Sequence, residues 1–98
     1  MTDIIITVPK ELSHKSCGLA KVGRDNIDQV PYWLLRVRPT KLNIGDWVWF
    51  VKDGYIIGKK QVESIEVTKE GTKLILGRYE SVEPIPYKSF RGFRYYEG

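Results

Sequence analysis

Apolar and polar residues alternate along several short stretches of the chain, and a period of two residues is the pattern of a β-strand. Trp33, Leu35 and Val37 share one face of such a stretch, while Arg36 and Arg38 lie on the other. The stretches that predict strands are Ile4–Val8, Tyr32–Pro39, Trp47–Lys52, Tyr55–Thr68, Thr72–Val82 and Phe93–Glu97. Five to six strands at this short spacing predict a mainly β (β-rich α+β) fold, built as a small barrel or strongly curled sheet.

Asp53-Gly54 is the strongest turn signal in the chain. It predicts a two-residue hairpin turn of type I′, because both central residues of that turn need a positive φ. Gly58, inside the returning strand, predicts a β-bulge. A further turn is expected at Lys69–Gly71.

Two segments lack a strand pattern. A short helical turn is expected near Glu11–Cys17, followed by a loop as far as Val30, and one or two short helices are expected in all. Glu83–Gly92 contains two prolines and predicts an irregular crossing before the last strand.

The tryptophans are concentrated in the hairpin that Asp53-Gly54 closes. Trp47 and Trp49 are two residues apart and therefore share a strand face, so we expect them to fill one layer of the core, joined by Trp33. The alternative is that one of them lines a cleft that binds a base.

Length and composition indicate one soluble domain over residues 1–98. A chain of this size supports a single core, and it contains no apolar run of the roughly 20 residues that a membrane helix needs. The only cysteine, Cys17, cannot form an internal disulfide, which is typical of a reducing compartment such as the cytoplasm.

The formal net charge is +4, and the positive charge is unevenly distributed. Residues 15–41 hold six cations against two anions, and residues 73–98 hold five against three. Clustered cations are typical of a phosphate-binding surface, although solvated surfaces of no particular function also show them.

Metal and cofactor chemistry find little support in the sequence. His14 and Cys17 are the only His/Cys pair, and a structural zinc site needs about four such ligands. Glycine-rich phosphate loops and serine nucleophile motifs are absent. We therefore expect no metal and no cofactor, and a binding module rather than an enzyme.

Cations that neighbour aromatic residues are the strongest functional signal. Arg78 precedes Tyr79, and Arg94 precedes Tyr95, an order that allows phosphate contact together with base stacking. The residues predicted to bind nucleic acid are Lys21, Arg24, Arg36, Arg38, Arg78, Tyr79, Arg91, Arg94 and Tyr95. In the competing interpretation, the tyrosines cap the barrel and the arginines pair with Glu80, Glu83 or Glu97.

The segment Arg38–Ile65 resembles the central part of PUA-like domains, especially the ASCH and EVE branches. The elements that carry the resemblance are Gly45-Asp46, the apolar strand Trp47–Val51 and the Ile56-Ile57-Gly58 element. The ending "RGFRYYEG" resembles the closing strand of these domains, so that the likeness covers about the last two thirds of the chain.

The resemblance implies a PUA-like pseudo-barrel that binds RNA or single-stranded nucleic acid, with RNA favoured. ASCH proteins often carry a Gly-x-Lys-x-x-Glu-x-Arg element, whereas this chain has Gly18, Lys21 and Arg24 without the glutamate. One alternative is a small hydrolase of modified nucleosides, with Lys21 as the base and Glu63 or Glu80 assisting. The other is a barrel that binds a protein partner through exposed aromatic residues.

Overall fold

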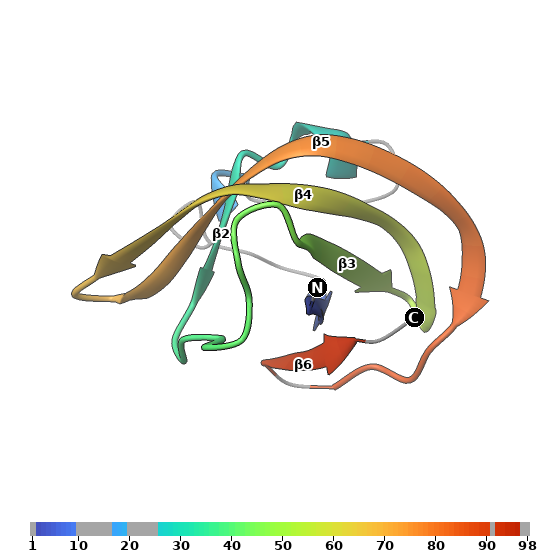
Figure 1. The fold of residues 1–98 in the computed structure, drawn as a ribbon. Helices are drawn as coiled ribbons and strands as arrows, with labels where there is room; N and C mark the ends of the chain where they lie inside the picture. The colour runs from blue at the N-terminus through green and yellow to red at the C-terminus, as the bar shows by residue number, and fades with distance from the viewer. Residues whose placement is uncertain (1, 10–16, 20–25, 91, 97–98) are drawn as a thin grey trace.

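The computed structural model describes residues 2–9, 17–19, 26–90 and 92–96, and its strands form one curled sheet (Figure 1). The strands are β1 (Asp3–Thr7), β2 (Tyr32–Leu35), β3 (Trp47–Lys52), β4 (Tyr55–Thr68), β5 (Gly71–Pro86) and β6 (Phe93–Tyr96). They lie in the order β2-β5-β4-β3-β1-β6, with β1 and β3 parallel and the other neighbours antiparallel. The long strands β4 and β5 arch over the others, so the sheet forms a half-barrel and the predicted mainly β fold is confirmed.

The hairpin between β3 and β4 has the predicted turn. Asp53 and Gly54 have φ values of 52° and 83°, so both central residues are in the left-handed region that a type I′ turn requires. The bulge is confirmed as well: Phe50 pairs with Gly58 and Val51 pairs with Ile56, which leaves one extra residue on β4.

Two strand boundaries differ from the prediction. Strand β2 ends at Leu35 rather than Pro39, because Leu35 pairs with Thr72 beside the β4–β5 turn and β5 runs out of pairing residues there. Val37 is consequently 67% exposed. Strand β5 ends at Pro86 and therefore includes the first four residues of the expected crossing, Glu83–Pro86. Near this end β5 pairs only with β4, so its prolines lie on an open edge, where they are tolerated.

The expected helical turn near Glu11–Cys17 lies, apart from Cys17, outside the described residues. A 3₁₀ turn, η1 (Ile27–Gln29), occupies part of the segment that was expected to be a loop. Among the described residues, no helix is long and apolar enough to span a membrane.

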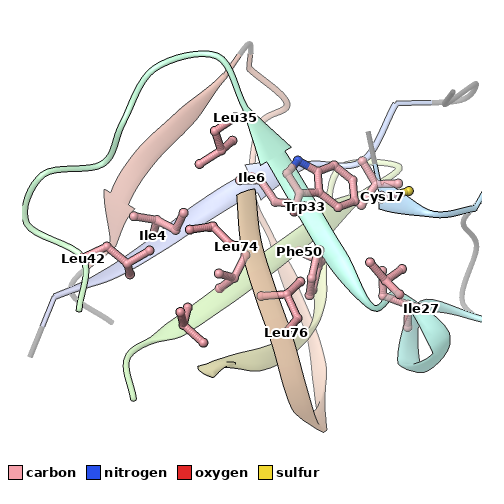
Figure 2. Packing of buried hydrophobic residues seen from close by; sticks show 14 of the residues in the cluster. Ile4, Ile6, Cys17, Ile27, Trp33, Leu35, Leu42, Phe50, Leu74 and Leu76 are labelled. Atoms are coloured by element: carbon pink, nitrogen blue, oxygen red, sulfur yellow. The ribbon is translucent and has the colours of Figure 1, made fainter. Parts of the chain in front are cut away.

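The buried apolar residues form two clusters, one on each face of β1 and β3. Even-numbered residues of these strands enter the main core, shown in Figure 2, together with residues of β2 and β5. Members of the main core include Ile4, Ile6, Trp33, Val48, Phe50, Leu74 and Leu76. The smaller core consists of Ile5, Val51 and Ile56, with Trp49, Val82, Tyr87, Phe90 and Tyr96 packed against it.

The expected layer of three tryptophans is wrong. Trp33 lies in the main core, edge-on to Phe50 at a centroid distance of 5.8 Å. Trp49 faces the opposite way and packs against the smaller core. Trp47 shares the strand face of Trp49 and belongs to neither cluster. The reason is that the curled sheet buries both faces of β3. The alternation of the sequence therefore shows that two residues share a face but does not show which core that face contacts.

Candidate nucleic-acid interface

Tyr95, on the edge strand β6, presents an exposed ring that is held by the connection between β2 and β3. The side chain is 38% exposed, and its hydroxyl oxygen accepts a hydrogen bond of 3.2 Å from the backbone N–H of Lys41. The Lys41 ammonium lies 5.5 Å from the centroid of the same ring. These contacts lower the pKa of Tyr95, chiefly through the backbone N–H of Lys41. A fixed, exposed ring beside a cation suits base stacking with phosphate contact.

As far as Gly45, the β2–β3 connection carries positive charge without a carboxylate, and its one acid, the buried Asp46, comes directly before β3. The sequence from Gln29 to Gly45 contains no Asp or Glu, and neither does the sequence from Pro84 to Tyr96. Together these two segments hold six cations, so the rest of the chain, with ten cations and twelve anions, is slightly acidic. The whole net positive charge of the protein therefore resides in the two segments that meet where Lys41 contacts Tyr95.

Arg36 and Arg38, both exposed, lie on this connection just beyond the end of β2. Val37, between them, is 67% exposed, and Ile44, further along the connection, is 66% exposed. The structure thus combines exposed cations with exposed apolar side chains on one connection. We call Arg36, Val37, Arg38, Lys41 and Tyr95 the Tyr95 surface.

Arg94 does not lie on the Tyr95 surface, although it is the neighbour of Tyr95 in sequence. Adjacent residues of a strand point to opposite faces, and Arg94 lies over the ring of Phe90, on the side of the smaller core, at 4.6 Å. Tyr95 instead packs edge-on against Phe93, at a centroid distance of 5.6 Å. The two residues are on one edge strand but serve different faces of the sheet.

Arg78 and Tyr79 are separated in the same way. The Arg78 guanidinium pairs with the Glu80 carboxylate at 3.2 Å, as the competing interpretation expected. The Tyr79 ring packs against Gly58, and its hydroxyl donates a hydrogen bond of 3.4 Å to the Ile57 carbonyl. Tyr79 is therefore a packing residue in this structure rather than an open stacking surface.

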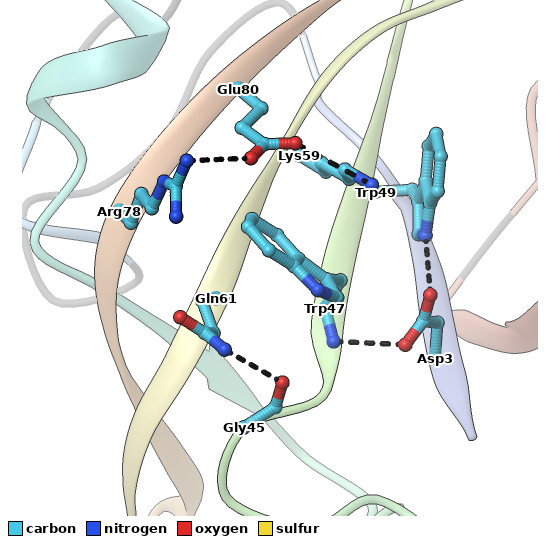
Figure 3. Close-up of polar contacts among 8 residues, drawn as sticks. All are labelled: Asp3, Gly45, Trp47, Trp49, Lys59, Gln61, Arg78 and Glu80. Carbon is cyan, nitrogen blue, oxygen red and sulfur yellow. Dashed lines mark hydrogen bonds and ion pairs between the residues drawn. The ribbon is translucent and has the colours of Figure 1, made fainter. Parts of the chain in front are cut away.

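A second group of aromatic and charged residues lies on the face of the sheet that carries Trp47 and Trp49 (Figure 3). The Lys59 ammonium lies 4.6 Å from the ring of Trp47 and 4.6 Å from the ring of Trp49. The same ammonium is 3.7 Å from the Glu80 carboxylate, which also forms the ion pair with the Arg78 guanidinium. We call Trp47, Lys59, Gln61, Arg78 and Glu80 the Trp47 face.

Asp3 fixes the backbone and the indole at the edge of this face. Its two carboxylate oxygens accept the backbone N–H of Trp47 at 3.0 Å and the indole N–H of Trp49 at 2.9 Å. Trp49 also packs on Tyr96 at a centroid distance of 4.9 Å. Trp49 is therefore anchored on several sides, whereas Trp47 is held mainly through its backbone.

A depression with a volume of about 380 Å³ lies between β2 and the tip of the β4–β5 hairpin. It is lined by Tyr32, Leu34, Thr68, Lys69, Glu70 and Lys73. The Lys73 ammonium lies 4.3 Å from the centroid of the Tyr32 ring.

Lys60 is the most buried charged side chain near η1, at 4% exposure. Its ammonium donates a hydrogen bond of 2.7 Å to the carbonyl of Val30 and thereby ties the end of η1 to the sheet. Burial lowers the pKa of Lys60, against the opposing influence of Asp28 and then Glu63. Because the amine is enclosed and already bonded, we assign it a structural role.

Three predicted binding residues, Lys21, Arg24 and Arg91, lie outside the described residues. The residues of these two surfaces that sequence reasoning missed are Lys41 and Lys59, whereas Trp47 was named in the alternative in which a tryptophan lines a base-binding cleft. The acid-free run from Gln29 to Gly45 could have indicated Lys41. Lys59 had no such signal, because its importance comes from its pairing with Trp49 across β3 and β4.

The acids named in the hydrolase alternative have other contacts, and its proposed base, Lys21, lies outside the described residues. No group of three or more His, Cys, Asp or Glu side chains that could hold a metal occurs in the described part of the chain. Glu80 forms ion pairs with Lys59 and Arg78, and Glu63 lies against Gly77.

Comparison with protein-family models, with curated proteins and with solved structures finds no match to this chain.

Proposed function

We propose that this protein binds single-stranded nucleic acid, with RNA favoured, on the Tyr95 surface. The observation that carries the proposal is the meeting of two acid-free segments at an exposed ring: Lys41 bonds to Tyr95, and all of the net positive charge lies in these segments. Phosphates would contact Arg36, Arg38 and Lys41, while a base stacks on Tyr95.

Two further considerations support this ligand class. Single strands offer unpaired bases for stacking, and a lone exposed tyrosine cannot reach the bases of an intact duplex without opening it. The resemblance of Arg38–Ile65 to PUA-like domains, which mostly bind RNA, also favours this ligand class, since the segment contains both Lys41 and β3.

The test is a fluorescence anisotropy titration of labelled single-stranded RNA and of DNA with the same sequence, at two salt concentrations. We expect binding that weakens steeply with salt, because each phosphate contact contributes about 0.7 to the slope of log K against log salt for single strands. A stronger affinity for RNA than for DNA would locate a contact to the 2′-hydroxyl. Absent or salt-insensitive binding would refute the proposal and favour a protein partner.

Matched variants make the test specific to the surface. Lys41→Gln and Lys52→Gln remove the same charge, but Lys52 lies at the far end of β3, beside the Asp53-Gly54 turn. We expect Lys41→Gln to reduce the salt slope by about 0.7 and Lys52→Gln to leave it unchanged. Tyr95→Ala should weaken binding by about 1–3 kcal/mol, the range for the loss of one base stack. Equal effects of the two lysine variants would show that only overall charge matters.

A further inference from the structure

Trp47 is a large aromatic residue whose ring belongs to neither hydrophobic core of the described part of the chain. It is half-buried on the face of the sheet that carries Trp49, yet Trp49 packs against the smaller core and Trp47 does not. Its neighbours in Figure 3 are polar: the Lys59 ammonium at 4.6 Å from its ring, and Gln61, its pairing partner on β4. Core packing therefore accounts for Trp49 but leaves Trp47 without a comparable role.

The position of Trp47 is fixed before any ligand arrives. Asp3 accepts its backbone N–H at 3.0 Å, and the Gln61 side-chain amide donates to the carbonyl of Gly45 at 3.0 Å, which fixes the turn that leads into β3. Lys59 rests against the ring and restricts it further. Because the backbone is already held and Lys59 limits the rotation of the ring, less conformational entropy is lost when a base stacks on Trp47 than on an unrestrained side chain.

Lys59, which lies over this ring, shares the Glu80 carboxylate with a second cation, Arg78. Arg78 is 72% exposed, and its partner Glu80 is 37% exposed, so their ion pair is open to solvent. Solvent-exposed pairs of this kind contribute little stability. A phosphate that approaches can therefore take the place of Glu80 beside Arg78 or Lys59 at low cost.

The Tyr95 surface and the Trp47 face lie on opposite faces of the sheet, because Tyr95 pairs with Ile4 of the main core whereas Trp47 shares the face of Trp49. One short segment passes from the first to the second. The chain from Lys41, which bonds to Tyr95, to Trp47 is six residues long and can span at most about 20 Å. Ile44, in the middle of this segment, is 66% exposed. Binding sites for single strands commonly extend over about 4–16 nucleotides, which is ample for this separation.

We infer that Trp47 is a second base-stacking position, and that the ligand is a single strand that lies on Tyr95 and on Trp47 at the same time. Arg78 and Lys59 contact the phosphates next to the base on Trp47. The inference rests on the proposed function, because it extends the same bound strand from the Tyr95 surface, past Ile44, onto the open face of β3 and β4.

The experiment measures the affinity of a series of oligouridylates of increasing length for the full chain and for Trp47→Thr, Arg78→Gln and Tyr95→Ala. Threonine is suited to a strand, and circular dichroism together with the unfolding midpoint confirms that each variant is folded. For the shortest ligands we expect equal affinities for wild type and Trp47→Thr. Beyond a threshold length, wild type should bind about 5- to 150-fold more tightly, the fold-change that corresponds to one lost stack.

Arg78→Gln provides a second readout, since substitution of an exposed residue of this kind changes stability little. It should lower the salt slope for long oligomers by about 0.7 and leave the slope for the shortest ones unchanged. If Trp47→Thr binds every length as wild type does, or if Arg78→Gln leaves the slope for long oligomers unchanged, the inference is overturned. Loss of binding in Tyr95→Ala would still uphold the proposed function in that case, whereas a wild-type protein that binds no oligomer would overturn both.

Discussion

Replacement of Gly58 by alanine tests the packing that removes Tyr79 from the candidate interface. A Cβ atom at Gly58 would lie 2.6 Å from Cζ and 2.7 Å from Cε1 of the Tyr79 ring and would also clash with its hydroxyl oxygen. Ordinary contacts begin near 3.4 Å, so the ring must move by almost an ångström. Gly58 does not have a positive φ, so its backbone conformation is open to alanine. The strain that the substitution introduces is therefore the steric clash with the Tyr79 ring.

The expected cost follows from what that movement disrupts. Overpacking of a well-filled site costs about 1–3 kcal/mol. The displaced ring also loses the hydrogen bond of 3.4 Å from its hydroxyl to the Ile57 carbonyl, which is worth about 0.5–1.5 kcal/mol. We expect Gly58→Ala to lower the free energy of unfolding by about 2–4 kcal/mol, a substantial part of the 5–15 kcal/mol typical of a domain.

Gly77→Ala is the matched control on the neighbouring strand β5. A Cβ there would meet the carboxyl group and, at 2.6 Å, the Cγ atom of Glu63. Glu63 is an exposed, flexible side chain that can rotate away. Because alanine also restricts the unfolded chain, we expect Gly77→Ala to change stability by less than about 1 kcal/mol.

Urea unfolding followed by tryptophan fluorescence measures both variants. The Gly58→Ala midpoint should fall by at least about 0.7 M, given slopes of about 1–3 kcal/mol/M for small domains. In a Tyr79→Ala background the same substitution should cost less than about 1 kcal/mol, because the clash is gone. Equal midpoints for Gly58→Ala and Gly77→Ala, or an undiminished cost in the Tyr79→Ala background, would show that the ring is not held where we describe it.

Three further outcomes are expected. Asp3→Ala should cost about 2–3 kcal/mol in chemical denaturation, because it removes the charged acceptor of the Trp47 and Trp49 N–H groups, and Asp3→Asn should cost less. Burial lowers the pKa of Lys60 below 10.5, so the unfolded state binds more protons than the native state in the alkaline range. The free energy of unfolding of the wild type should therefore rise towards pH 10.5 relative to that of Lys60→Met. Parallel plots of this free energy against pH for the two proteins would contradict the prediction. Cys17 is fully buried and its pKa is raised, so a disulfide reagent should modify it far more slowly in the native protein than in denaturant.

Local sequence signals were sufficient for most of the strands and for the β3–β4 hairpin. Asp53-Gly54 and Gly58 are short-range signals, since turn type and bulge depend on residues that are adjacent in the chain. The boundaries of β2 and β5 were not accessible in this way. They depend on how far the partner strand extends, and the partner of Leu35 is Thr72, 37 positions away.

Sequence alone indicates only part of the arrangement at the candidate interface. Arg78 and Tyr79, like Arg94 and Tyr95, are neighbours in sequence, so alternation assigns the members of each pair to opposite faces of a strand. The contact between Lys41 and Tyr95 has no local signal, since it joins residues 54 positions apart through the curl of the sheet.

The hairpin that holds Trp47 and Trp49 shows why aromatic density alone is ambiguous. Both residues occupy one face of β3, but the sheet curls so that Trp49 reaches the smaller core while Trp47 remains over polar neighbours on β4. One strand face can thus supply a core residue and an open ring within three positions.

Binding through Tyr95 and Trp47 together would explain how so small a surface can hold a flexible ligand. A single base stack, worth about 1–3 kcal/mol, gives weak binding, and the few exposed cations add a contribution that salt removes. When one strand occupies both rings, the second contact forms at the high effective concentration set by the short linking segment, so the two contributions reinforce each other. Affinity should therefore rise abruptly once the strand is long enough to reach both rings, whereas a surface that acts through charge alone would show a gradual rise with every added phosphate.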